Sequence, residues 1–102
     1  MSLRQILLST ALYSLVVIGP VQASDVAPSV ALLSSSCAAC HGTNGHAQGD
    51  MPSLAGLEPS YFIQQMQDFR NGVRPSTVMQ QQASGYSENE IRLMATFFAK
   101  QK

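Results

Sequence analysis

Charged residues are scarce in this chain. Only 12% of its 102 residues are Asp, Glu, Lys or Arg, and the six basic residues balance the six acidic ones. Because no basic patch is present, neither nucleic acid nor an anionic membrane surface is favoured as a partner. The sequence has no internal repeat, and no stretch alternates apolar and polar residues for long enough to predict a β-strand. The chain is therefore expected to form helices and loops.

Cysteine is equally rare: the chain has two, and both lie in the segment Cys37-Ala38-Ala39-Cys40-His41. The spacing C-x-x-C-H is the attachment signature of c-type haem. Two thiols three positions apart can add to the two vinyl groups on one edge of a haem, and the next residue is then delivered beneath the iron. The motif therefore predicts one covalently bound haem c, held by Cys37 and Cys40, with His41 as an axial iron ligand.

Three other interpretations of the motif are weaker. A thioredoxin-like redox pair is expected in a βαβ context, and no strand precedes Cys37. A structural zinc site needs four ligands in a tetrahedron, and the nearby candidates, the two cysteines with His41 and His46, are crowded together. His46 is better interpreted as a solvated loop residue. A disulfide between Cys37 and Cys40 would close a short, strained loop that contributes little stability.

The N-terminus has the features of an export signal. Arg4 precedes an apolar run over residues 6–18, and residues 21–23 (Val-Gln-Ala) suit a signal peptidase. A membrane anchor is the alternative, but the run is too short to span a bilayer comfortably and is interrupted by Gly19-Pro20. We therefore expect residues 1–23 to be a cleaved signal peptide. Export agrees with the haem motif, because haem is attached to such motifs on the outer side of the bacterial inner membrane.

Cleavage would leave residues 24–102 as a single mono-haem domain in the periplasm, without a membrane span. Such a short chain is marginally stable alone, and a covalently bound haem supplies a large apolar element around which helices can pack. The predicted fold class is all-α, with three to four short helices around one haem. The haem-free chain is expected to be poorly folded.

Local signals predict where the helices lie. The first helix runs from about Val26 or Pro28 into the haem motif, and repeated glycines and prolines make residues 42–56 a loop. The second helix spans residues 59–71 and stops at Gly72. Its apolar face is formed by Phe62, Ile63, Met66 and Phe69.

The third helix has the clearest start. Ser87 and Glu90 form a capping box, and Tyr86 and Ile91 are placed for a hydrophobic staple. The buried stripe of this helix is expected to comprise Ile91, Met94, Phe97 and Phe98.

The second axial ligand decides whether a haem carries electrons or binds small molecules. Met66 and Met94 lie in the apolar stripes of helices and are expected to be core residues. Met79 lies in the connection between the second and third helices, which is long enough to pass over the opposite face of the haem. Met79 is therefore the predicted second ligand. Met51, which follows His41 closely, is the second choice, and an open sixth site is the third.

Two further roles follow from the positions of residues in the sequence. The backbone carbonyl of Pro52 is placed to accept a hydrogen bond from the outer ring nitrogen of His41 and so to orient the ring, although a proline that merely shapes the loop fits the sequence equally well. Arg70 and Arg74 could pair with haem propionates, but solvated surface arginines are the better expectation.

From Cys37 to Phe98 the chain resembles class I c-type cytochromes, in particular the bacterial group around cytochromes c4, c5 and c553. The resemblance is carried by residues 37–45, 51–56 and 61–72 and by the final aromatic helix. The stretches 75–79 (Pro-Ser-Thr-Val-Met) and 85–87 (Gly-Tyr-Ser) are most similar to the cytochrome subunit of flavocytochrome c sulfide dehydrogenase. This resemblance implies a small class I cytochrome c fold and Met79 as the sixth iron ligand. It also implies a redox partner, an FAD-containing subunit that oxidises sulfide and passes electrons to the haem.

The predicted function is electron transfer through a haem with His and Met ligands, not catalysis by this chain. The chain would act as the electron-accepting subunit of a flavocytochrome c sulfide dehydrogenase. One alternative is a free soluble electron shuttle to an oxidase or reductase. Another is a ligand-binding or peroxidatic haem protein whose sixth site is open.

Overall fold

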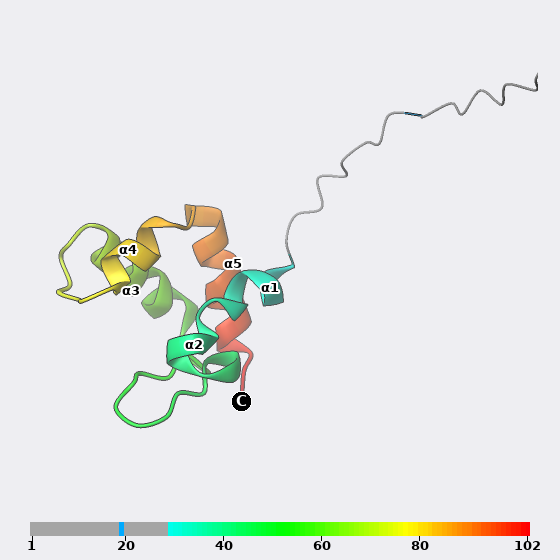
Figure 1. The fold of residues 1–102 in the computed structure, drawn as a ribbon, viewed down its shortest axis with the longest axis horizontal. Coiled ribbons are helices and arrows are strands. Elements are labelled where there is room, and N and C mark those ends of the chain that lie inside the picture. The colour runs from blue at the N-terminus through cyan, green and yellow to red at the C-terminus, as the bar shows by residue number, and fades with distance from the viewer. Residues whose placement is uncertain (1–18, 20–28) are drawn as a thin grey trace, which may run out of the picture.

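The fold is a set of short helices with long connections. The computed structural model describes residue 19 and residues 29–102, and the predicted signal peptide falls almost wholly outside these ranges. The elements in chain order are α1 (Val30–Ser35), α2 (Ala38–His41), the 3-10 turn η2 (Thr43–Gly45), α3 (Pro59–Arg70), α4 (Met79–Ser84) and α5 (Glu88–Ala99) (Figure 1). The described residues contain no strand, which confirms the predicted all-α class. None of the helices in these ranges has the length and apolar character needed to cross a bilayer.

The first predicted helix is shorter than expected and is interrupted. It begins at Val30, after the N-cap Ser29, rather than at Val26 or Pro28, which precede the described range. It ends at Ser35, and α2 forms a separate turn. The hydroxyls of Ser35 and Ser36 donate to backbone carbonyls of the preceding turn, at 2.6 and 3.2 Å. Serines that bond to the backbone in this way compete with helix continuation, which accounts for the break before the haem motif.

The second predicted helix is confirmed to within one residue as α3. Its N-cap is Glu58, whose carboxylate accepts from the backbone N–H groups of residues 60 and 61 at 2.8 and 3.2 Å. At its other end Gly72 has a φ of +71°, which a glycine adopts without steric cost. The N–H of Val73 donates to the carbonyl of Asp68 at 2.9 Å, and that of Gly72 to Phe69 at 3.2 Å. This pattern is a Schellman motif, and it ends the helix where the sequence predicted.

The start of α5 is also confirmed. The Ser87 backbone N–H donates to the Glu90 carboxylate at 2.7 Å, and the Glu90 N–H donates to the Ser87 hydroxyl at 3.2 Å. Both halves of the capping box are therefore formed. Tyr86 packs partly buried against the core cluster that includes Ile91, as the staple requires.

Helix α4 was not predicted. Its sequence, Met-Gln-Gln-Gln-Ala-Ser, has no apolar period, and Ala83 is its only buried residue. The segment is nevertheless helical because it packs along α3. Its Met, Gln and Ala residues favour helix, but six residues are too few to form a stable helix without this tertiary contact.

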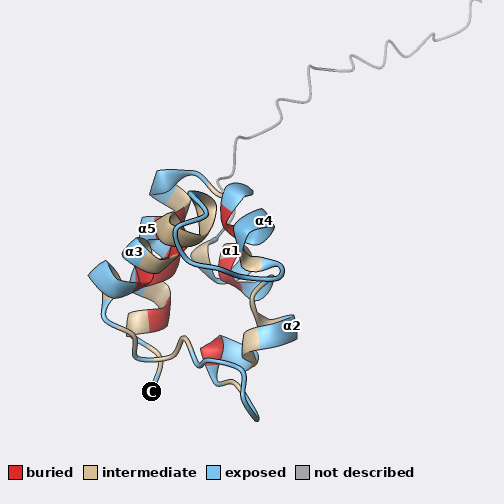
Figure 2. Cartoon of the chain, turned by 90° about the vertical axis from the view of Figure 1, so that its left-hand side faces the viewer, coloured by how far each residue is buried: buried red, intermediate tan, exposed pale blue. Residues whose placement is uncertain are grey.

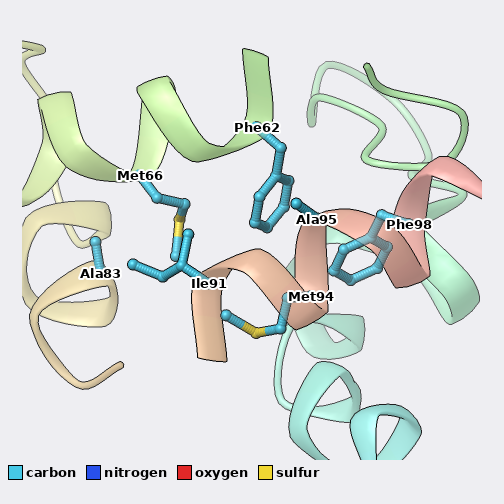
Figure 3. Packing of buried hydrophobic residues seen from close by; sticks show 7 residues of the cluster. All are labelled: Phe62, Met66, Ala83, Ile91, Met94, Ala95 and Phe98. Atoms are coloured by element: carbon cyan, nitrogen blue, oxygen red, sulfur yellow. The ribbon is translucent and has the colours of Figure 1, made fainter. Parts of the chain in front are cut away.

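The core lies between α3, α4 and α5. Figure 2 shows most of the buried residues on α3 and α5, and Figure 3 shows side chains from these three helices pointing toward one another. Seven apolar residues are buried: Phe62, Met66, Ala83, Ile91, Met94, Ala95 and Phe98. The apolar faces predicted from the sequence are thus confirmed in five positions, while Ile63, Phe69 and Phe97 are only partly buried.

Candidate functional site

The two cysteines lie on one turn of backbone. Cys37 is the N-cap of α2 and Cys40 lies within it, with the His41 N–H donating to the Cys37 carbonyl at 2.9 Å. Residues three and four positions apart are neighbours on a helix surface, so Cys40 and His41 both lie beside Cys37. Both thiols are free, with Cys37 partly buried and Cys40 exposed. Burial raises the pKa of the Cys37 thiol, and a hydrogen bond with the Ser36 side chain lowers it by less.

Gly42 reverses the chain directly after the histidine. Its φ is +80°, and a Cβ at this position would lie 1.9 Å from the backbone oxygen of His46. No other residue fits, because both the backbone conformation and the contact exclude a side chain. The chain therefore reverses its direction immediately after α2.

The loop that follows presents a carbonyl to the histidine ring. His41 Nδ1 lies 2.6 Å from the backbone oxygen of Pro52. A carbonyl can only accept, so Nδ1 carries a hydrogen and Nε2 is the ring nitrogen left to bind a metal. This is the arrangement found in histidines that bind a metal through Nε2. The hydrogen bond predicted between these residues is thus present in the structure.

The loop is held in place at both ends. The Gly45 carbonyl accepts from the N–H groups of Leu54 and Ala55 at 2.8 and 3.1 Å. The N–H of Gly56 donates to the carbonyl of Phe98 at 2.9 Å, which ties the loop to the end of α5. Pro52 therefore lies two residues before a fixed anchor, and its carbonyl has a defined direction.

The methionines occupy three kinds of environment. Met66 and Met94 are 5% and 0% exposed and belong to the core, as predicted. Met51 is 42% exposed in the loop before the α3 helix. Met79 is the first residue of α4 and is partly buried against the core. The structure brings His41 and Pro52 together, whereas Met79 lies on a helix that packs mainly against α3.

Arg74 is exposed, as expected, whereas Arg70 is only partly exposed and does not fit the expectation of a solvated surface residue. The Arg70 side chain is 25% exposed, forms an ion pair with Glu88 at 2.5 Å and donates to backbone carbonyls. Arg74 donates to Gln65 at 2.5 Å, and its guanidinium lies 4.6 Å from the centre of the Phe69 ring. The partners of Arg70 lie 13 to 18 positions away, so sequence position alone did not identify them.

The residues around the motif fit a large apolar prosthetic group. Two free thiols on one turn and an imidazole with a free Nε2 form the donor set that a covalently attached haem requires. In residues 37–57 only Gly45 is buried, so this side of the domain has almost no core of its own. A haem bound here would give Leu54 and Leu57, which are half-buried, an apolar partner.

The fold and the motif define a small helical protein of the c-type haem class. The family model for cytochrome c matches residues 26–102, and the chain belongs to the cytochrome c family. Covalently bound haem c is therefore its cofactor, and its role is that of an electron carrier.

Several relatives share this domain. The cytochrome subunit of sulfide dehydrogenase from Chlorobaculum tepidum is 48% identical over 66% of this chain and 61% of its own length. Cytochrome c4 from Pseudomonas aeruginosa is 34% identical over 65% of this chain and 33% of its own. A solved structure of cytochrome c4 from Acidithiobacillus ferrooxidans matches with a TM-score of 0.61 and 36% identity, covering 63% of this chain and 37% of that one. The chain thus spans less than two thirds of the length of these relatives. The predicted membership of the bacterial c4-like group, with similarity to the sulfide dehydrogenase subunit, is confirmed.

Proposed function

We propose that this cytochrome carries single electrons through one haem attached at Cys37 and Cys40, with His41 and Met79 as axial ligands. The observation that carries the proposal is the hydrogen bond from His41 Nδ1 to the Pro52 carbonyl directly after the C-x-x-C-H motif. It leaves Nε2 as the only ring atom that can bind a metal. When bound, the haem supplies a one-electron iron couple.

The chain's own residues hold and orient the group. Cys37 and Cys40 attach it, and Pro52 fixes the His41 ring and increases the basicity of its Nε2. Met79 is favoured as the second ligand because Met66 and Met94 are buried in the core and Met51 lies in the loop that already serves His41. A methionine ligand raises the reduction potential, and a filled sixth site excludes small ligands.

The electron donor we propose is an FAD-containing sulfide dehydrogenase subunit in the periplasm. The similarity to the Chlorobaculum tepidum subunit supports this. In such a complex the flavoprotein would oxidise sulfide, and this chain would accept the electrons without catalysing the reaction. The c4 relatives favour a second candidate, a free soluble shuttle that delivers electrons to an oxidase or reductase.

The visible spectrum of the protein purified from its own periplasm tests the ligands and the partner. A haem c spectrum with the weak far-red methionine-to-iron band and a flavin shoulder is expected for the complex. The methionine band without flavin would support the free shuttle. A first residue at Ser24, found by N-terminal sequencing, would support the predicted cleavage after residue 23, and an uncleaved N-terminus would contradict it.

A matched pair of variants tests the sixth ligand. Met79→Ala should abolish the far-red band and allow carbon monoxide to bind the reduced protein, whereas Met51→Ala should leave both properties unchanged. The reverse result would make Met51 the ligand. Rapid carbon monoxide binding by the unmodified protein would overturn methionine ligation and favour a ligand-binding or peroxidatic haem protein.

A further inference from the structure

Helix α4, which begins with the proposed ligand, cannot fix its own position. It has six residues and one buried residue, Ala83, and one side-chain hydrogen bond at its start, from the Gln80 N–H to the Ser76 hydroxyl at 3.1 Å. Helices of this length are not stable alone. Met79 and Ala83 are four residues apart, so they lie on the same face, about 6 Å apart along the helix axis. A contact that holds Ala83 therefore also affects where Met79 lies.

Arg70 holds the end of α4 from the neighbouring helix. Its Nη2 and Nε donate to the Ala83 carbonyl at 3.2 and 3.4 Å. Nη2 also donates to the carbonyl of Tyr86, and Nη1 pairs with the Glu88 carboxylate at 2.5 Å. The planar fork of donors in a guanidinium makes one side chain able to reach three groups at once. One residue thereby fixes the end of α4, the connection after it and the start of α5.

The groups that Arg70 contacts are themselves anchored. The Glu88 carboxylate also accepts from the Gln67 side chain at 3.2 Å, one turn before Arg70 on α3. The Tyr86 hydroxyl is hydrogen-bonded to Ser36, the residue before Cys37. The Arg70 clamp, by which we mean the contacts of Arg70 with residues 83, 86 and 88, therefore connects α4 both to α3 and to the segment that carries the haem motif.

We infer that Arg70 is a positioning residue for the iron ligand Met79: by holding the Ala83 carbonyl, it sets how far and in which direction the thioether extends. This inference rests on the proposed ligation by Met79. The Arg70 contacts were invisible in the sequence, because two of the three acceptors are backbone carbonyls. The positive charge of Arg70 at the C-terminal end of α4 also interacts favourably with the helix dipole, so the same contact stabilises the helix itself.

The test uses the haem-loaded protein and four variants. Arg70→Ala removes the clamp. Arg70→Lys keeps the charge but cannot reproduce the fork, and it serves as the main variant if Arg70→Ala does not accumulate as folded holoprotein. Arg92→Ala is the matched control, because Arg92 lies exposed on α5 and its charge also acts on Glu88. Met79→Ala removes the proposed ligand and serves as the reference for a fully open sixth site. The readouts are the far-red band, carbon monoxide binding to the reduced protein and helical circular dichroism.

In the Arg70 variants we expect a weaker far-red band and an affinity of the reduced protein for carbon monoxide that is at least about tenfold higher. Helical content should be retained in Arg70→Lys. The Arg92→Ala control should match the unmodified protein. The inference would be overturned if both Arg70 variants showed the same far-red band and the same carbon monoxide binding as the Arg92→Ala control. This conclusion requires that Met79→Ala loses the band. If Met79→Ala keeps the band, the proposed ligand itself is wrong. If Arg92→Ala weakens the far-red band as much as Arg70→Ala does, the effect comes from the loss of a positive charge in general, and the positioning role is refuted.

Discussion

Substitution of Gly45 by alanine should destabilise the domain strongly. Gly45 is buried and has a φ of +82°, a conformation that costs an alanine about 1–2 kcal/mol. An added Cβ would lie 2.8 Å from the Ala55 nitrogen and 2.9 Å from atoms of Leu54 and Phe98. Contacts this short force neighbours to move, at a further cost of about 1–3 kcal/mol. The expected loss of about 2–5 kcal/mol is a large part of the roughly 5–10 kcal/mol that a domain of this size has.

Gly49 provides a matched control. Its φ is +62°, and a Cβ there would meet nothing within 4 Å, so Gly49→Ala should lose only the backbone cost of about 1–2 kcal/mol. Guanidinium unfolding of both holoproteins, followed by circular dichroism and by haem absorbance, measures the difference. Equal stability of the two variants would refute the close packing of Gly45 against the loop and α5. Because the Gly45 carbonyl also anchors the loop that carries Pro52, Gly45→Ala should in addition shift the midpoint potential, and Gly49→Ala should not.

Three other expectations concern packing, capping and pH. Met94→Ala should cost about 2–5 kcal/mol in chemical unfolding, because Met94 is fully buried; a loss below about 1 kcal/mol would contradict its place in the core. Ser87→Ala should cost about 1 kcal/mol through loss of the N-cap of α5 and leave the far-red band intact; loss of the band would assign Ser87 a role at the haem. Hydrogen bonds from the Ser60 side chain and then from the Tyr61 backbone lower the pKa of the Glu58 carboxyl. Its stabilising contribution is therefore fully present above the unfolded-state pKa and is lost as pH falls through the lower folded-state value. The stability difference between the unmodified protein and Glu58→Gln should accordingly shrink below about pH 4 in acid unfolding curves, and a pH-independent difference would refute the role of this carboxylate.

The parts of the fold that the sequence predicted are those with local signals. Pro59 and Gly72 mark the ends of α3, and Ser87 with Glu90 marks the start of α5. These signals act within a few residues, and their energies depend little on the rest of the molecule. The hydrogen bond between His41 and Pro52 was one of two interpretations that the sequence allowed, and the two residues are only 11 positions apart.

The parts that the sequence did not reveal depend on distant contacts. Helix α4 is too short to be stable alone, although Met, Gln and Ala favour helix, and it depends on its packing along α3. The role of Arg70 depends on carbonyls 13 and 16 positions away, which every residue type carries and which therefore leave no trace in the sequence. The ligation by Met79 stays a prediction that the spectroscopic tests address.

The acceptor that orients the His41 ring belongs to the main chain, and this has a consequence for how the protein can evolve. A substitution at position 52 replaces a side chain, but it cannot delete a backbone carbonyl. The orientation of the imidazole thus depends on the backbone path of the loop. Mutations should change it mainly at positions that determine this path, such as Gly42 and Gly45. A substitution among the exposed side chains of the loop should therefore leave the histidine orientation unchanged as long as the backbone path is kept.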